Sequence, residues 1–165
     1  MDKLNNQQIL QQLTDRLGAD ISRHEEPYGL LTIHTSKAQI IEVLRFLKDS
    51  VGFIYLTDIT AVHYPEGENT FAIVYHVHNL VENVRLRIKV TIPVSDPKIP
   101  SATVVWAGAN WMERETYDFF GVQFEGHPDL RRILNMDDME VFPMRREYPL
   151  EDPNRVDKRD FYFGR

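Results

Sequence analysis

Apolar residues recur at helical spacing in the first third of the chain. One such run extends from Asn5 to Leu17, and Gly18 follows it as a natural stop. Residues 28–34 have the composition of a strand, after which Ser36 can cap a second helix that ends near Ser50. The pattern therefore predicts two amphipathic helices with a strand between them. Their apolar positions are Ile9, Leu10, Leu13, Leu17, Ile40, Ile41, Val43, Leu44 and Leu47.

Three further strands are predicted over residues 53–62, 70–78 and 84–92, separated by the turn-rich segments 65–69 and 79–83. Such short connections favour an antiparallel meander. Apolar and polar residues alternate in the last of these strands, so one face of the sheet is expected to be buried and the other exposed to water. The inward positions are Val84, Leu86, Ile88, Val90 and Ile92, and the outward ones are Arg85, Arg87, Lys89 and Thr91.

A third helix is predicted over residues 110–120. Asn110 and Glu113 have the spacing of a capping box, and Gly121 is a natural stop. An apolar stripe on this helix is expected to pack on the sheet; it consists of Met112, Thr116, Phe119 and Phe120. The sequence thus predicts a two-layer α+β fold, in which a mainly antiparallel four-stranded sheet packs with about three helices.

Residues 121–165 differ in character from residues 1–120, which we take as the α+β domain. Prolines interrupt this last part of the chain and its apolar clusters are brief, so it is predicted to form an extended irregular tail. It carries more large apolar residues than a solvated linker does, which indicates that it becomes ordered against another chain. At ~3.3 Å per residue the tail can reach on the order of 100 Å. Its large apolar residues are Phe142, Met144, Tyr148, Leu150, Phe161, Tyr162 and Phe163.

Composition excludes several kinds of chemistry. The chain has no cysteine, which removes disulfides, thiolate nucleophiles, cysteine-ligated zinc and the usual ligands of iron–sulfur clusters. A formal net charge of −6, with acidic and basic residues mixed along the chain, provides no basic stripe for nucleic acid. No apolar stretch reaches the ~20 residues of a membrane span and the first residues do not resemble a secretion signal, so a cytoplasmic protein is expected.

Two histidines give an alternative hypothesis. His76 and His78 lie two residues apart on a predicted strand and would project from the same face, a spacing that metal sites use. His63 could join them only if strand pairing aligned it, and no carboxylate lies on the strand of the pair. We favour the interpretation that these histidines lie on the surface or face a partner over the hypothesis that they form the metal site of a small enzyme. Phosphate-binding and nucleophile-elbow motifs are missing, and the pair Asp137–Asp138 has the character of a solvated turn.

Aromatic residues and arginines are dense between residues 111 and 134, a composition typical of interface cores. Part of this cluster has an ordinary helical explanation. Glu113 and Glu115 would complement the helix dipole in the first turn, and Arg114 can reach Asp118 one turn later. The aromatic and arginine content remains to be explained.

This segment resembles the thirty-kilodalton subunit, also called the C subunit, of respiratory complex I. The signature of that family is Glu-Arg-Glu, two free positions, an acid, two large apolar residues, six free positions, His or Lys, and a basic-apolar ending. Residues 113–134 match it at every fixed position, and residues 109–111 and 145–150 extend the resemblance. Val141-Phe142-Pro143 departs from the Gly-His-Pro that many members carry there. The signature and interface residues are Trp111, Glu113, Arg114, Glu115, Tyr117, Asp118, Phe119, Phe120, Gly121, His127, Pro128, Arg131, Arg132, Leu134, Arg145, Arg146, Tyr148 and Pro149.

The resemblance implies a structural subunit of the hydrophilic arm of a proton-pumping NADH:quinone oxidoreductase. Such a subunit has no catalytic, cofactor-binding or metal-binding residues of its own, because NADH, flavin, iron–sulfur clusters and quinone belong to partner subunits. Its expected partners are the subunit that forms the quinone site and the subunit that carries the terminal iron–sulfur cluster. Its expected location is peripheral, on the cytoplasmic side of the inner (plasma) membrane, with membrane contact only through the complex.

Other functions stay open on the sequence alone. An equivalent subunit of a ferredoxin- or hydrogenase-linked relative would carry the same signature, and partner identity would separate it from the NADH-linked enzyme. A regulatory binding module with this fold is a further alternative, although it leaves the signature unexplained. The histidine-based metal enzyme predicts stoichiometric metal in the purified chain.

Overall fold

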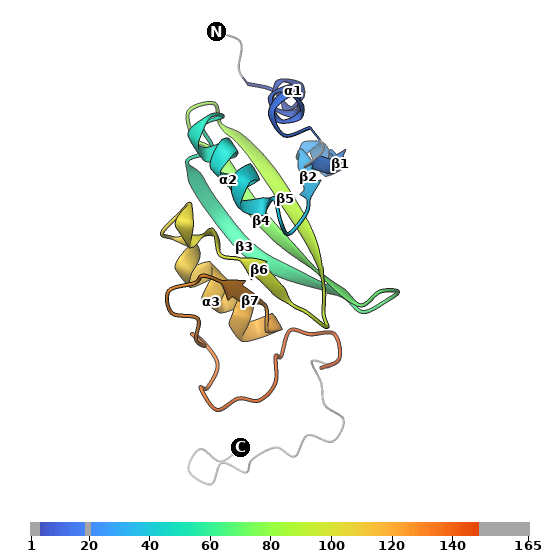
Figure 1. Ribbon diagram of the computed structural model, residues 1–165, viewed down its shortest axis with the longest axis vertical. Coiled ribbons are helices and arrows are strands. Elements are labelled where there is room, and N and C mark those ends of the chain that lie inside the picture. Colours follow the sequence, from blue (N-terminus) through green and yellow to red (C-terminus); the bar gives the residue numbers. More distant parts are fainter. Residues whose placement is uncertain (1–3, 19–20, 149–165) are drawn as a thin grey trace, which may run out of the picture.

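The computed structural model describes residues 4–18 and 21–148. This part of the chain forms two layers, a twisted sheet and the helices that lie against one of its faces (Figure 1). The elements, in chain order, are α1 (Asn6–Leu17), β1 (Ile21–Glu25), η2 (Pro27–Gly29), β2 (Thr32–Thr35), α2 (Ile40–Asp49), β3 (Tyr55–Tyr64), β4 (Thr70–Asn79), β5 (Val84–Pro93), β6 (Lys98–Pro100), η3 (Ala102–Val104), α3 (Ala109–Phe120) and β7 (Gln123–Glu125).

The main sheet has the strand order β1-β2-β5-β4-β3 in the described residues. β3, β4 and β5 form the predicted antiparallel meander, and β2 joins β5 in parallel. The α+β class and the mainly antiparallel sheet are therefore confirmed, but the count of four strands is wrong. β1 was missed because its sequence, Ile-Ser-Arg-His-Glu, lacks the apolar alternation of a half-buried strand.

Alternation along β5 separates the two faces of the sheet as predicted. Leu86, Ile88, Val90 and Ile92 are all buried beneath the helices, whereas Arg85 and Thr91 are exposed. The core consists of this sheet face together with the inward residues of α1, α2 and α3. Burial of apolar side chains on one sheet face is what holds the layers together, at about 25 cal/mol per Å² removed from water.

The ends of the helices correct two capping predictions. Ser36 does not cap α2, which begins at Ile40 after a turn, and Asn110 lies inside α3 and does not precede it. The predicted first helix is confirmed, and Asn5 forms a full capping box with Gln8. The strand predicted over residues 28–34 is confirmed only in its later part, as β2. Residues 28 and 29 belong to η2, where Tyr28 has a left-handed conformation at φ 57°.

Two elements lie around the predicted end of the domain. β6 and β7 pair in parallel, so residues 123–125 return to a strand that precedes α3. Both strands were missed because each has only three residues, too few to show a pattern. The division into residues 1–120 and a tail stays a prediction, although β7 and the residues after it pack against α3. Pro149, Leu150 and the aromatic residues near 161–163 lie outside the described residues.

Candidate functional site

Asp118 is the centre of a buried polar site at the end of α3. Its side chain is fully buried, and its Oδ2 accepts hydrogen bonds from the backbone N–H groups of Ile133, Leu134 and Asn135 at 3.1, 2.8 and 2.9 Å. Its Oδ1 accepts a 2.7 Å hydrogen bond from Nη1 of Arg132. Burial alone would raise the pKa of Asp118, but the Asn135 N–H and the Arg132 guanidinium outweigh it and hold the pKa far below its usual range. The carboxylate is therefore ionised at neutral pH.

Arg132 extends this site into the segment that follows. Its guanidinium also donates to the backbone carbonyl groups of Asp118, Met139 and Val141, and it lies 5.1 Å from the ring centroid of Phe142. One planar side chain thus binds α3 and two distant points of an irregular stretch. The five donors of arginine suit this role, which a lysine ammonium cannot reproduce in the same geometry.

Arg114, one turn before Asp118 in α3, also binds the irregular segment that contains Arg132. Its Nε and Nη2 donate to the carbonyl oxygens of Arg131 and Arg132 at 3.1 and 2.8 Å, and its guanidinium stacks at 5.4 Å over Trp111. The predicted pair between Arg114 and Asp118 is therefore wrong. Both side chains bond to backbone groups of residues 131–135 instead of to each other. Those carbonyl and N–H groups have no partner within their own irregular segment, and buried backbone groups need one.

Arg145 fastens the far end of the segment. Its Nε donates to the carbonyl of Phe120 at 2.7 Å, and its guanidinium lies 4.8 Å from the ring centroid of Phe142. Gly121 ends α3 at φ 77°, where a Cβ atom would lie 2.6 Å from the ring of Phe142. A glycine is required there both by the left-handed backbone and by this close contact. We call residues 127–148 the clasp segment.

Glu113 lies buried at the opposite end of α3. Its carboxylate accepts hydrogen bonds from Ser101 Oγ at 2.7 Å and from the Ala102 N–H at 2.6 Å. The nearest ring nitrogen is Nε2 of His127, 4.0 Å away, and that nitrogen is already 3.1 Å from the carbonyl of Asn110. Burial raises the pKa of Glu113 to about 7, although the hydrogen bonds from Ser101 and Ala102 oppose the rise.

The signature residues thus divide into groups by burial. Four fixed positions of the signature are buried inside the chain: Glu113, Arg114, Asp118 and Phe120. Gly121, which follows them, is also buried. In the single chain these residues are enclosed by other parts of the chain, and their role at an interface stays a prediction. Half-buried members of the signature are Tyr117, Phe119, His127, Arg132 and Arg145. The exposed members are Trp111, Glu115, Pro128, Arg131, Leu134, Arg146 and Tyr148, while Pro149 lies outside the described residues.

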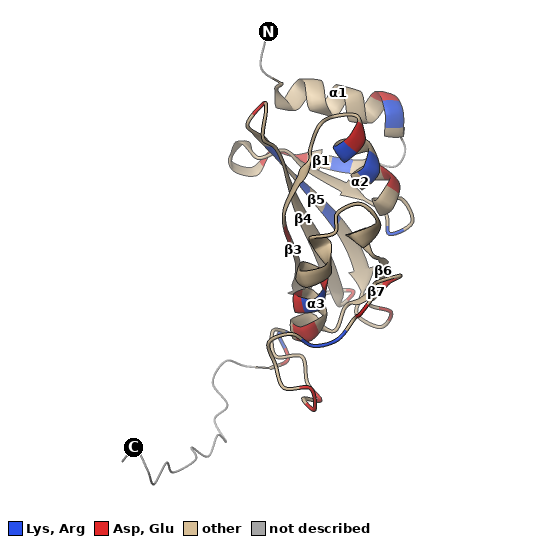
Figure 2. Ribbon diagram, turned by 90° about the vertical axis from the view of Figure 1, so that its left-hand side faces the viewer, with Lys and Arg blue, Asp and Glu red and all other residues tan. Residues whose placement is uncertain are grey.

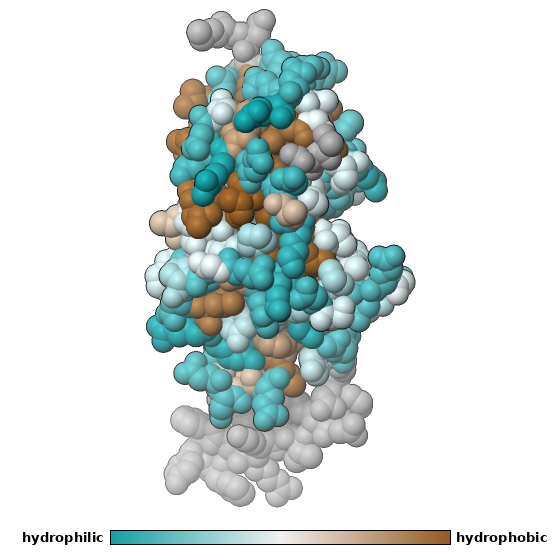
Figure 3. All heavy atoms as spheres, in the orientation of Figure 1, coloured by the Kyte–Doolittle hydropathy of each residue, from teal (hydrophilic) through white to brown (hydrophobic). Residues whose placement is uncertain are grey.

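Large apolar side chains point outward around the clasp segment. Trp111, Leu134, Met136 and Met144 are 61, 66, 71 and 56% exposed. Figure 3 shows apolar residues in several separate places among the polar residues of one face, and Figure 2 shows acidic and basic residues mixed along α3 and the residues after it. Apolar side chains gathered within a charged surface are typical of a contact with another protein.

The candidate histidine site is not assembled. His63 pairs with Phe71 across the strands, so it faces the core side of the sheet, whereas His76 and His78 face the open side. His76 accepts a 2.8 Å hydrogen bond from Arg87, and His78 lies 3.2 Å from Asn83. Among the residues that the structure describes, no three His, Cys, Asp or Glu side chains are arranged to hold a metal ion.

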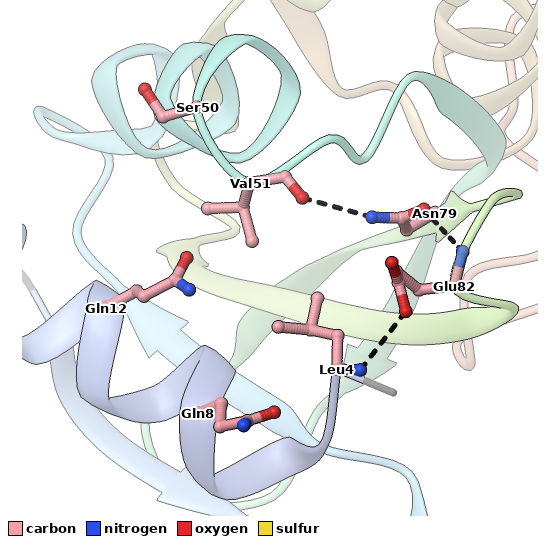
Figure 4. Close-up of a pocket in the computed structure, with 7 residues that line it drawn as sticks. All are labelled: Leu4, Gln8, Gln12, Ser50, Val51, Asn79 and Glu82. Atoms are coloured by element: carbon pink, nitrogen blue, oxygen red, sulfur yellow. Dashed lines mark hydrogen bonds between the residues drawn. The ribbon is translucent and has the colours of Figure 1, made fainter. Parts of the chain in front are cut away.

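A polar pocket lies at the other end of the molecule, between α1, the end of α2 and the turn after β4 (Figure 4). Asn79 organises it by donating to the carbonyl of Val51 at 3.1 Å and accepting from the N–H of Glu82 at 3.0 Å. Glu82 in turn accepts from the N–H of Leu4 at 3.2 Å. These bonds tie α1 and α2 to the sheet, so the pocket has a structural explanation.

Comparisons with known proteins agree with the signature. The family model for the respiratory-chain NADH dehydrogenase 30 kDa subunit matches residues 33–154. The C subunit of the NADH-quinone oxidoreductase of Geobacter sulfurreducens is 40% identical over 152 residues, which cover 92% of this chain and 93% of that protein. The corresponding C 1 subunit of the Rhizobium meliloti enzyme is 44% identical over 140 residues, covering 84% of this chain and 69% of that protein.

Solved structures show the same fold. A trypsin-resistant fragment of Nqo5 matches with a TM-score of 0.65 and 32% identity, over 74% of this chain and 98% of the fragment. A chain of the membrane-bound sulfane sulfur reductase, an archaeal respiratory membrane complex, matches with a TM-score of 0.77 and 25% identity, over 93% of this chain and 95% of that chain. The fold is thus that of a component of respiratory complexes. The chain belongs to the 30 kDa subunit family of respiratory-chain NADH dehydrogenase, whose curated relatives are C subunits of NADH-quinone oxidoreductase.

Within the described residues, no helix is long and apolar enough to cross a membrane.

Proposed function

We propose that this chain is a cofactor-free structural subunit in the hydrophilic arm of a proton-pumping NADH:quinone oxidoreductase. The observation that carries the proposal is the clasp, in which three arginines of low exposure hold residues 127–148 against α3 while Leu134, Met136 and Met144 face outward. Because the backbone of this segment is already held in place, its apolar side chains can bind a neighbour without the entropy cost of ordering the segment on binding. The neighbours are the quinone-site and terminal-cluster subunits.

The same proposal assigns the chemistry to partner subunits. The chain has no cysteine to ligate an iron–sulfur cluster, and its buried acids, Glu113 and Asp118, are enclosed by groups of the chain itself. Electron transfer from NADH to quinone then takes place in the neighbours, which this subunit holds in register. Its contact with the membrane is indirect, on the cytoplasmic side, through the assembled complex.

The test is a surface substitution that leaves the clasp intact. Leu134→Asp combined with Met136→Asp is expected to abolish recovery of the complex, because it places two charges in an apolar contact. Val81→Asp, at a side chain 86% exposed in the turn after β4, is the matched control. The measurement is affinity purification from native membranes in mild detergent, followed by NADH:quinone reductase activity. Normal recovery and activity of the double variant would contradict the proposal.

A second candidate is the equivalent subunit of a ferredoxin- or hydrogenase-linked relative of the NADH-linked enzyme. It is favoured by the TM-score of 0.77 with a chain of the sulfane sulfur reductase complex. The proteins recovered in the same purification separate the two candidates. Recovery of flavin-site subunits identifies the NADH-linked enzyme. Recovery of a hydrogenase-like subunit without flavin-site subunits identifies the second candidate.

A further inference from the structure

A groove runs between the edge of the sheet and α3. β3 is the last strand on that side of the sheet, and α3 lies along it. The groove has a volume of about 330 Å³; its lining includes Asp58, Ile59 and Thr60 of β3, Glu115 and Phe119 of α3, and Met144 of the clasp segment. Of the surface hollows in the described residues, this one joins the sheet, the signature helix and the clasp segment.

Two carbonyl groups on this side of the sheet, one in β3 and one just before it, are already bonded within the chain. Thr116 Oγ1 donates to the carbonyl of Ile59 at 3.2 Å, and Trp106 Nε1 donates to the carbonyl of Ile54 at 3.0 Å. Both carbonyl groups are thereby used by residues of the same chain. Strand addition requires unpaired backbone groups in sequence, so the groove suits a side chain better than a strand.

The walls of the groove combine an apolar surface with acidic groups at its rim. Ile59 is buried, Phe119 is half-buried and Met144 is 56% exposed, which gives a floor that a hydrocarbon stem can cover. Asp58 and Glu115 supply one carboxylate from each wall. A long basic side chain matches both parts, because its stem is apolar and its head is charged.

Neither carboxylate is paired with an arginine or a lysine within the described residues. Glu115 is exposed and has no hydrogen bond or ion pair there, unlike Glu113 and Asp118 on the same helix. The nearest basic group to Asp58 is Nδ1 of His76, 3.8 Å away. Burial and the neighbouring Arg87 lower the pKa of His76, so it is a weak counter-charge at neutral pH. Two acids without an arginine or lysine partner therefore line one groove.

We propose that this groove receives an arginine or lysine side chain of a neighbouring subunit. The stem lies on Phe119 and Met144, and the charged head sits between Asp58 and Glu115. This inference rests on the proposed function, because the neighbour belongs to the same complex. It also gives a role to Glu115, the acid of the signature that has no hydrogen-bond partner in the described residues. Charge pairs at the edge of an apolar contact set its orientation and its sensitivity to salt.

The experiment compares the full complex containing the wild-type chain with one containing Asp58→Asn and Glu115→Gln together. We expect the double variant to leave the membrane-extracted complex at lower salt, with about tenfold weaker association, since both acids of the pair are removed. Glu42→Gln, at an exposed acid of α2, is the matched control and should behave as wild type. Thermal unfolding of the purified variants checks that the exposed substitutions leave the fold unchanged.

Charge reversal sharpens the test. Glu115→Lys should exclude the chain from the complex, and an arginine-to-glutamate or lysine-to-glutamate change in the contacting neighbour should restore it. A carboxyl-to-amine cross-linker applied to the wild-type complex should join Glu115 or Asp58 to a lysine of a neighbour whenever the basic residue is lysine. Recovery of both Glu115→Lys and the double variant at the wild-type salt dependence would overturn the proposal. So would a cross-link to residues 149–165 or to a second copy of this chain.

The experiment distinguishes a failure of the groove proposal from a failure of the proposed function. If the wild-type chain is not recovered with NADH:quinone oxidoreductase subunits, the proposed function fails. If the wild-type chain is recovered and the double variant matches it at every salt concentration, the groove proposal alone fails.

Discussion

Asp118 and Arg132 are bonded at 2.7 Å across fourteen positions of the chain, and both side chains are shielded from solvent. The pair joins the last turn of α3 to the first part of the clasp segment. Its carboxylate also holds three successive backbone N–H groups, so the chain direction at residues 133–135 depends on one side chain.

Removal of that carboxylate is expected to open the clasp. Asp118→Ala leaves Arg132 and three N–H groups without their acceptor, which costs about 3–5 kcal/mol when one partner of a buried ion pair is lost. Urea unfolding of the purified chain measures the loss, and limited proteolysis locates it between residues 127 and 148. Asp129→Ala, whose pair with Arg131 is exposed, should change stability by less than about 1 kcal/mol. Equal stability of the two variants would contradict this account.

Glu113 is expected to make stability depend on pH in the neutral range. Its pKa is about 7 in the folded chain against an ordinary 4.5, so folding takes up a proton between these values. The stabilisation is complete below about pH 4.5 and is lost as pH rises through 7. At about 1.4 kcal/mol per pKa unit the loss is roughly 3 kcal/mol.

Glu113→Gln should remove this part of the pH dependence. The measurement is the free energy of unfolding of wild type and variant at pH 5, 6, 7 and 8, where the difference between the two proteins should change by roughly 3 kcal/mol. A difference that is constant with pH would show that Glu113 does not titrate in this range. Glu115→Gln serves as the control, because Glu115 is an exposed acid of the same helix outside the buried site.

Gly121→Ala is expected to displace the far end of the clasp. The added methyl group would lie 2.6 Å from Phe142 and from Nη2 of Arg145, and the backbone at φ 77° disfavours any side chain. We expect a loss of about 2–4 kcal/mol, as strain and overpacking combine. Gly126→Ala is the matched control: its φ is 85°, but nothing lies within 4 Å of the added methyl group. The measurement is the Tm from thermal unfolding. An equal decrease of the Tm in the two variants would contradict a role for the Phe142 contact.

The sequence predicted the fold more fully than the site. Strands β3 to β5 and the stop of α3 at Gly121 follow from local patterns, so their positions were predicted closely. Residues Ser101 and Arg132 act through partners 12 and 14 positions away, and no local pattern reveals such partners. Glu113 illustrates the limit, because an acid in a first turn has the same sequence signal whether it complements the helix dipole in solvent or is buried against η3.

The bonds from Arg132 to the clasp segment do not depend on the side chains there. Arg132 reaches residues 139 and 141 through their carbonyl oxygens, which every amino acid possesses. A substitution at either residue therefore leaves both acceptors in place as long as the backbone keeps its path. The outward side chains of this stretch can change without removing the bonds that hold its backbone to α3.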